Sequence, residues 1–156
     1  IIMLDNCTIE ERWNAVDKLV ERWLQERQLV IVQFCALSGV HELNQDDDPS
    51  NMRLQNFCQL LVDYMSAGHF EVYYEVIREA EAFQDGSANL AKDLMPEITL
   101  TTKISMDFND LYTGAKGDLG HLSNSLSNLG ENLAARFELE DQLINTMHES
   151  HREQVA

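Results

Sequence analysis

Carboxylate and histidine side chains are the residues of this chain that could hold a metal ion. A di-iron or di-manganese site in a helical bundle needs Glu-x-x-His on two helices, because side chains at i and i+3 point together into the core. The chain has no Glu-x-x-His, and the nearest spacing, Asp118-x-x-His121, occurs once beside two glycines. His148 and His151 lie near the C-terminus, where helices fray. These patterns predict no metal site, and we expect no cofactor.

The sequence also lacks a pattern typical of a catalytic nucleophile or of a phosphate-binding loop. A Walker-type glycine loop is absent, and no Ser-His-acid or Cys-His arrangement is singled out by spacing. Cys7, Cys35 and Cys58 lack the spacing of a zinc site or a disulfide framework. Cys35 and Cys58 lie in apolar stretches, where a free cysteine behaves as a small hydrophobic residue. We therefore expect a protein that is not an enzyme.

The charge balance is strongly acidic, with a net charge of −16. This balance argues against direct binding of nucleic acid, where cationic contacts to phosphate dominate, and against docking on an anionic membrane. It suits a basic protein partner, although acidity can also serve only to keep a protein in solution. The longest apolar stretch, 29–40, is shorter than the roughly 18 residues of a membrane span and lacks signal-peptide flanks. We expect a cytoplasmic protein.

The spacing of apolar residues predicts helices throughout. Only 7 Gly and 2 Pro interrupt the chain. Ile9, Trp13, Val16, Val20 and Trp23 recur every three or four residues, as on one face of a helix. The stretch 29–37 is apolar nearly all round and is predicted to be a buried helix, although its Val-Ile-Val run would also suit a strand. Further helices are predicted over 50–64, 70–80, 87–94, 96–111 and 119–147, with turns at 66–68 and 84–87.

These elements predict the fold class. It is all-α: an antiparallel up-and-down helical bundle with long helices and short loops. No repeat or internal boundary divides the chain. We expect a single domain over residues 3–156, with Ile1 and Ile2, which precede Met3, left outside it.

Three groups of polar and aromatic residues stand out against this framework. Asp63, Ser66, His69 and Phe70 cluster at the predicted turn, where Gly68 would permit a sharp change of direction; the group could equally be a helix stop and cap. Glu140 lies on the apolar stripe of the last helix, where a carboxylate needs a partner. Arg136 comes four residues earlier and could pair with Glu140 along the helix. The pair could be a structural ion pair or part of a binding site. Trp23 continues the first apolar stripe, so it is either a core residue or an interface anchor.

Taken together, the sequence resembles the Rsd/AlgQ family of regulators of sigma D. Three runs carry the resemblance: Lys18-Leu19-Val20-x-Arg22-Trp23-Leu24, the run from Phe57 to Phe70 that includes Asp63-Tyr64 and Ser66-Ala67-Gly68-His69-Phe70, and the run from Ala135 to Ile144 that includes Arg136-Phe137 and Leu139-Glu140-Asp141.

The resemblance implies a helical bundle that binds region 4 of the primary sigma factor of bacterial RNA polymerase. Region 4 is a basic helix-turn-helix that reads the −35 promoter element and docks on core polymerase, so an acidic protein covering it would block both contacts. A helical adaptor for a different partner, or a carboxylate-bundle metalloprotein, is the alternative. The resemblance implies that eight residues face sigma or shape the site: Trp23, Asp63, Ser66, His69, Phe70, Arg136, Phe137 and Glu140.

Overall fold

Long helices make up the described part of the protein. A computed structural model describes residues 9–38, 48–115 and 119–155. Its long helices are α1 (Ile9–Ser38), α2 (Asp48–Ala67), α3 (Tyr73–Phe83), α4 (Ser87–Tyr112) and α5 (Leu122–Val155). The short elements are a π-helix, η2 (Gly68–Val72), and two 3₁₀ turns, η3 (Thr113–Ala115) and η4 (Leu119–His121). None of these helices is long and apolar enough to cross a membrane.

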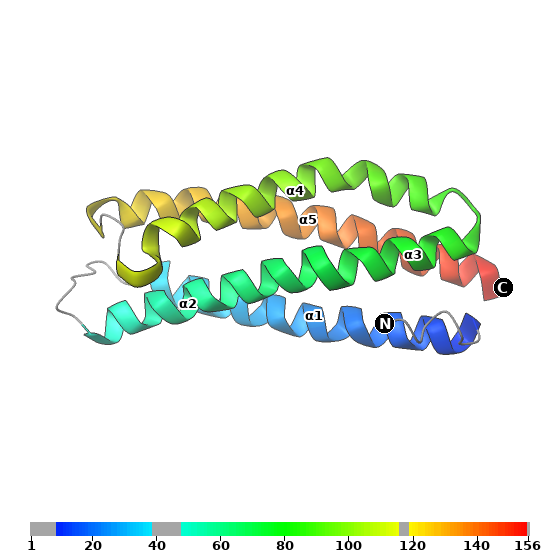
Figure 1. Ribbon diagram of the computed structural model, residues 1–156, viewed down its shortest axis with the longest axis horizontal. Helices are drawn as coiled ribbons and strands as arrows, with labels where there is room; N and C mark the ends of the chain where they lie inside the picture. The colour runs from blue at the N-terminus through cyan, green and yellow to red at the C-terminus, as the bar shows by residue number, and fades with distance from the viewer. Residues whose placement is uncertain (1–8, 39–47, 116–118, 156) are drawn as a thin grey trace.

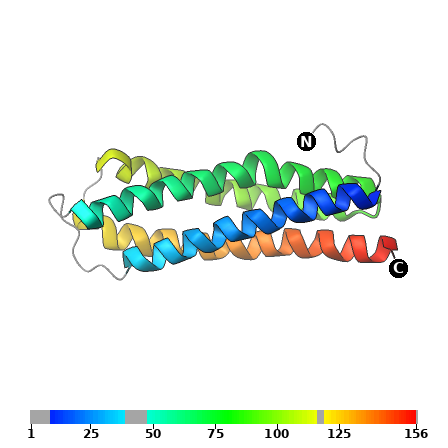
Figure 2. The same cartoon turned by 90° about the horizontal axis from the view of Figure 1, so that it is seen from below.

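The long helices lie side by side along one axis in alternating directions (Figure 1). α2, η2 and α3 together make one rod, and α1, α4 and α5 are the other three. In the perpendicular view, α1 lies along α5 and the start of α1 is at the same end as the finish of α5 (Figure 2). The predicted all-α antiparallel bundle is confirmed, and helix rather than strand is confirmed for the Val-Ile-Val run, which lies within α1.

The predicted turn at residues 66–68 is wrong. The chain continues from α2 through η2 into α3 without changing direction (Figure 1). Gly68 is buried, and its φ is not in the left-handed region. A π-helix is a single wide turn inserted into an α-helix, often at a functional site. Small size, rather than conformational freedom, is what this position requires.

The predicted boundary before Pro96 is also wrong, because Pro96 lies inside α4. Proline has no N–H to donate to the carbonyl four residues earlier, and its ring crowds that carbonyl. Both Pro96 and Lys92, which carries the carbonyl, are exposed. Water can therefore solvate the unbonded group, and the helix can continue past the proline.

The turn predicted at residues 84–87 is confirmed. Gln84 adopts a left-handed conformation with φ 55°, and Gly86 has φ 87°. The Asp85 carboxylate accepts a hydrogen bond of 3.0 Å from the backbone N–H of Ser87, which begins α4. Glycine at position 86 supplies the positive φ that lets α4 fold back along α3.

The second half of α1 is less buried than its composition predicts. Val30 and Leu37 lie in the core, but Leu29 is 52% and Val32 50% exposed. Cys35, expected to behave as a buried apolar residue, is exposed, whereas Cys58 is buried. A helix at the surface of a bundle has only one side against its neighbours, so an apolar residue on the other side remains in water.

We expect Pro96→Ala to stabilise the fold by about 2 kcal/mol, because alanine restores a helical N–H and removes the ring that crowds the Lys92 carbonyl. The free energy of unfolding from a urea titration tests this expectation. Glu97→Ala, at the adjacent exposed position, should change it by less than about 0.5 kcal/mol. An unchanged or lower stability for Pro96→Ala would mean that α4 is adapted to the proline.

Candidate functional site

The predicted cluster around the π-helix forms an exposed surface. Asp63, Ser66 and Phe70 are all exposed and follow one another at helical spacing along α2 and η2. The Asp63 carboxylate accepts a hydrogen bond of 2.9 Å from the Gln59 amide, which leaves capacity for further donors. The Phe70 side chain is 75% exposed. An acid and an aromatic ring are thus presented together to solvent.

His69 lies at the base of this surface and is only half-buried. Its ring meets Phe70 edge-on at 5.2 Å and Tyr73 at 6.4 Å between ring centroids. The buried Nδ1 atom has no hydrogen-bond partner among the described residues. His69 therefore supports the exposed Phe70 ring by contact.

Two further carboxylates extend the exposed surface. Burial raises the pKa of Glu26 on α1, and the nearby charges of Asp63 and Glu71 raise it further, while Arg22 opposes them. Glu71 itself is exposed within η2. Sequence reasoning missed Glu26 because only the packing of α1 against α2 brings it near Asp63. Three carboxylates, those of Glu26, Asp63 and Glu71, thus lie near one another on this surface.

Trp23 lies beneath the π-helix and does not face solvent, being 2% exposed. Its ring stacks on Tyr64 with centroids 5.4 Å apart and meets Tyr73 edge-on at 5.5 Å. A Cβ atom at Gly68 would lie only 3.1 Å from the Trp23 ring and 3.2 Å from the Tyr73 ring. Trp23 is therefore a core residue that supports η2 from inside, and Gly68 makes room for it.

Arg136 and Glu140 form a buried ion pair. Both side chains are 0% exposed, and Nε of Arg136 donates to Oε2 of Glu140 at 2.9 Å. The hydroxyl of Tyr73 donates to Glu140 at 2.7 Å, and that of Tyr64 donates to the other carboxylate oxygen. The pairing predicted along the helix is confirmed.

The remaining donors of Arg136 reach two other helices. Nη2 donates to the hydroxyl of Tyr73 at 2.6 Å, and Nη1 donates to the hydroxyls of Thr101 at 3.1 Å and Thr102 at 2.6 Å. Guanidinium donors and carboxylate acceptors are thus matched inside the bundle, as a buried charge requires. The network of Arg136, Glu140, Tyr64, Tyr73, Thr101 and Thr102, called here the buried polar network, joins α2, α3, α4 and α5.

Arg27 of α1 extends this network toward the surface. Its Nη1 atom lies 2.8 Å from Asp141 and 3.7 Å from Glu140, and its guanidinium lies 5.1 Å above the ring of Phe137. Phe137 is half-buried between α1 and α5. Sequence reasoning missed Arg27, since its partners lie more than one hundred residues away along the chain.

The buried polar network keeps its two phenols protonated. Burial raises the pKa of Tyr64 and of Tyr73 above the ordinary value of 10, and the negative charge of Glu140 raises both further. Burial also raises the pKa of Glu140, against the opposing effects of Arg136 and the two hydroxyl donors. The phenols therefore remain hydrogen-bond donors to this carboxyl at neutral pH.

The histidines near the C-terminus take part in packing against α1. His151 stacks on Trp13 with centroids 3.6 Å apart, and Nε2 of His148 lies 3.2 Å from Asp17. Asp118 falls outside the described residues. Within 9–38, 48–115 and 119–155, no three His, Cys, Asp or Glu side chains gather into a group that could hold a metal ion.

Residues 3–148 match the family described as "Regulator of RNA polymerase sigma(70) subunit, Rsd/AlgQ". The chain belongs to the Rsd/AlgQ family. It is 35% identical to the regulator of sigma D of Yersinia pseudotuberculosis serotype O:1b (strain IP 31758), over 92% of this chain and 87% of that protein. It is 36% identical to the regulator of sigma D of Enterobacter sp. (strain 638), over 96% of this chain and 94% of that protein. No solved structure matches the chain.

The Rsd/AlgQ match covers all eight predicted site residues, and the structure divides them into two sets. Asp63, Ser66 and Phe70 are at the surface, with His69 at its base. The others lie inside the bundle or between helices: Trp23, Arg136, Phe137 and Glu140. Any role of Trp23, Arg136 and Glu140 must therefore act through the positions of other residues.

We expect Glu140→Ala to destabilise this Rsd/AlgQ protein by about 3–5 kcal/mol, because it leaves the Arg136 charge buried without its partner. Glu138→Ala, an exposed position in the same helix, is the matched control and should cost less than about 0.5 kcal/mol. Urea unfolding followed by circular dichroism measures both. Equal stabilities for the two variants would show that the buried pair contributes nothing.

We also expect stability to fall as the pH rises above about 10. Tyrosines of the unfolded chain lose their protons near that pH, whereas the raised pKa values of Tyr64 and Tyr73 keep them protonated in the folded state. The stabilisation is complete below the unfolded value and is lost as pH climbs toward the folded values. The part of the phenolate absorbance that Tyr64→Phe or Tyr73→Phe removes should appear together with loss of helical circular dichroism. Its appearance in a fully helical protein would contradict the expectation.

Proposed function

We propose that this chain is an anti-sigma regulator that binds region 4 of the primary sigma factor of RNA polymerase. In this role it covers the surfaces by which region 4 contacts core polymerase and the −35 promoter element. The observation that carries the proposal is the exposure of Asp63 at the end of α2 and of Phe70 in the adjoining π-helix, both within the residues that match the family. The relatives' name, regulator of sigma D, supports the same partner.

The chemistry of the exposed surface fits a basic helical domain. A sigma arginine can donate a charge-assisted, bidentate pair of hydrogen bonds to the Asp63 carboxylate. Glu26 and Glu71 add negative potential around it. The Phe70 ring offers an apolar contact that loses its exposure to water on binding, as aromatic anchors of interfaces do. Ser66 adds a hydroxyl at the exposed position between Asp63 and Phe70.

The interior residues support this function indirectly. Tyr73 follows η2 directly and is held by the ion pair of Arg136 and Glu140. Trp23 fills the space under Gly68. These contacts fix the backbone that presents Phe70, so binding costs little ordering of the chain. The interior set therefore shapes the site without touching the partner.

Regulation of this kind needs no catalysis and no cofactor. It takes place in the cytoplasm, where the polymerase works, and involves neither direct binding of nucleic acid nor a membrane. The net charge of −16 favours encounter with a basic domain and disfavours contact with DNA phosphates.

Asp63→Ala should weaken binding to the purified primary sigma factor by about 2–5 kcal/mol, because the sigma arginine would be buried without its partner. The dissociation constant from calorimetry measures this loss. Asp93→Ala, which removes an exposed carboxylate of α4, is the matched control and should bind like the parent. Both variants should keep the parent's melting temperature.

A sigma factor from which region 4 has been deleted should not bind the parent. Parent-like affinity for Asp63→Ala would exclude this residue as the contact. Unfolding of Asp63→Ala would make it a structural residue instead. Absence of any binding between the parent and intact sigma factor would refute the proposed function and favour an adaptor for another partner.

A further inference from the structure

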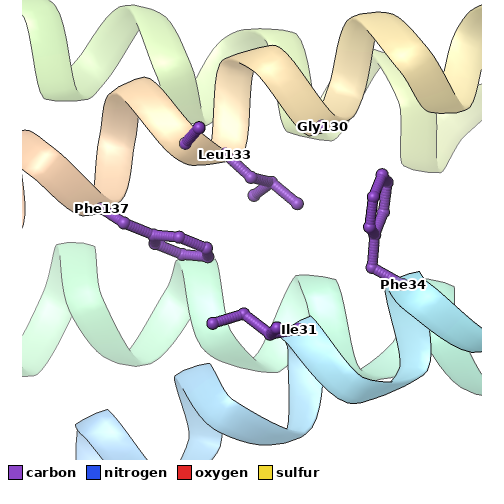
Figure 3. A pocket seen from close by; sticks show the side chains of 6 residues that line it. Ile31, Phe34, Gly130, Leu133 and Phe137 are labelled. Atoms are coloured by element: carbon purple, nitrogen blue, oxygen red, sulfur yellow. The ribbon is translucent and has the colours of Figure 1, made fainter.

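An apolar groove lies between α1 and α5. It has a volume of about 250 Å³ and is lined by Ile31 and Phe34 of α1 and by Gly130, Leu133, Ala134 and Phe137 of α5. The side chains from the two helices face one another across an open space (Figure 3).

The walls of the groove are held in place at both ends. Phe34 lies against Gly130, where a Cβ atom would approach its ring to 2.8 Å, so glycine permits this contact. At the other end Arg27 covers the Phe137 ring and pairs with Asp141. Between these two contacts α1 and α5 leave the apolar walls uncovered. The volume is below the roughly 300 Å³ at which small-molecule sites begin, and it suits one or two apolar side chains.

The wall formed by α5 is acidic. Glu131 and Glu138 are exposed and lie three and four residues from Ala134, which makes them its neighbours on the helix surface. Between residues 122 and 149 the only Lys or Arg is Arg136, and its side chain is completely buried. An apolar groove with an acidic wall fits an amphipathic helix whose apolar side is flanked by cations.

The groove lies next to the Asp63 surface, on the other side of α1. Glu26 interacts with Asp63 and Glu71, while the next residue, Arg27, pairs with Asp141 on α5. The two faces lie on different sides of α1 and are offset along it, since Ile31 and Phe34 come five and eight residues after Glu26, about 8–12 Å of helix. Leu29 and Val32, each about half exposed, add apolar surface to the part of α1 between them.

We infer that this groove is a second contact site for the same sigma partner. Apolar side chains of a cationic helix of that partner occupy the groove, while the Asp63 surface makes the first contact. The inference rests on the proposed function. The partner then lies across the second half of α1. The apolar residues of α1 that the core leaves exposed become buried in the complex, and the acidic wall sets the direction of the bound helix.

Ala134→Arg tests the groove, because Ala134 is an exposed lining residue and the new side chain both fills the groove and repels cations. Ala135→Arg is the matched control, since Ala135 is the exposed neighbour outside the groove and the change of charge is identical. Calorimetry with the intact primary sigma factor should give at least a tenfold weaker affinity for Ala134→Arg and less than a twofold change for Ala135→Arg. Ala134→Leu, which fills the groove without charge, should also weaken binding.

Four results are decisive. Selective loss of affinity in both Ala134 variants, with unchanged melting temperatures, supports the groove contact. Equal affinities for Ala134→Arg and Ala135→Arg overturn it, and the proposed function then stands if Asp63→Ala still weakens binding. A parent that self-associates, and that Ala134→Arg converts to a monomer in sedimentation, overturns it by assigning the groove to a second copy of this chain. Failure of the parent to bind sigma factor removes the proposed function and this inference together.

Discussion

The charges of Arg136 and Glu140 are completely buried, and their hydrogen-bond partners come from three other helices. Removing both charges from water costs several kcal/mol per ion unless donors and acceptors are matched. Here two tyrosine hydroxyls donate hydrogen bonds to the carboxylate. The guanidinium donates hydrogen bonds to Tyr73 and to two threonine hydroxyls. These partners come from α2, α3 and α4, so the pair can be buried only when α5 and all three of these helices are in place.

The same interactions determine the form of the exposed surface. Tyr73 begins α3 immediately after the π-helix, and its hydroxyl is fixed between Arg136 and Glu140. Trp23 packs on Tyr64 and Tyr73, and it also fills the space beside Gly68. The wide turn is therefore held from inside, while Phe70 remains in solvent. The buried ion pair of Arg136 and Glu140 is thus linked through Tyr73 to the helix turn that carries the exposed Phe70 ring.

One side of helix α1 packs in the core, and the other side forms part of the protein surface. Val30 and Leu37 face the core, whereas Leu29 and Val32 do not. Glu26 approaches α2 and Arg27 approaches α5, although the two are adjacent in sequence, because successive residues of a helix point about 100° apart. The apolar composition of residues 29–37 predicted helix correctly but predicted burial wrongly. Composition does not specify how many neighbours a helix will have.

The helical fold class, the turn at Asp85-Gly86 and the pairing of Arg136 with Glu140 were all predicted correctly, because each depends on spacing along one stretch of chain; the interruptions predicted at 66–68 and before Pro96 were not. Other features depend on how the helices pack. Packing placed Trp23 inside, brought Glu26 to Asp63 and Arg27 to Asp141, and let α2 pass through Gly68 without a turn. It also left the Ile31 and Phe34 face of α1 partly uncovered. These outcomes depend on which helices meet side by side, and contacts between residues far apart in sequence carry no local pattern that could predict them.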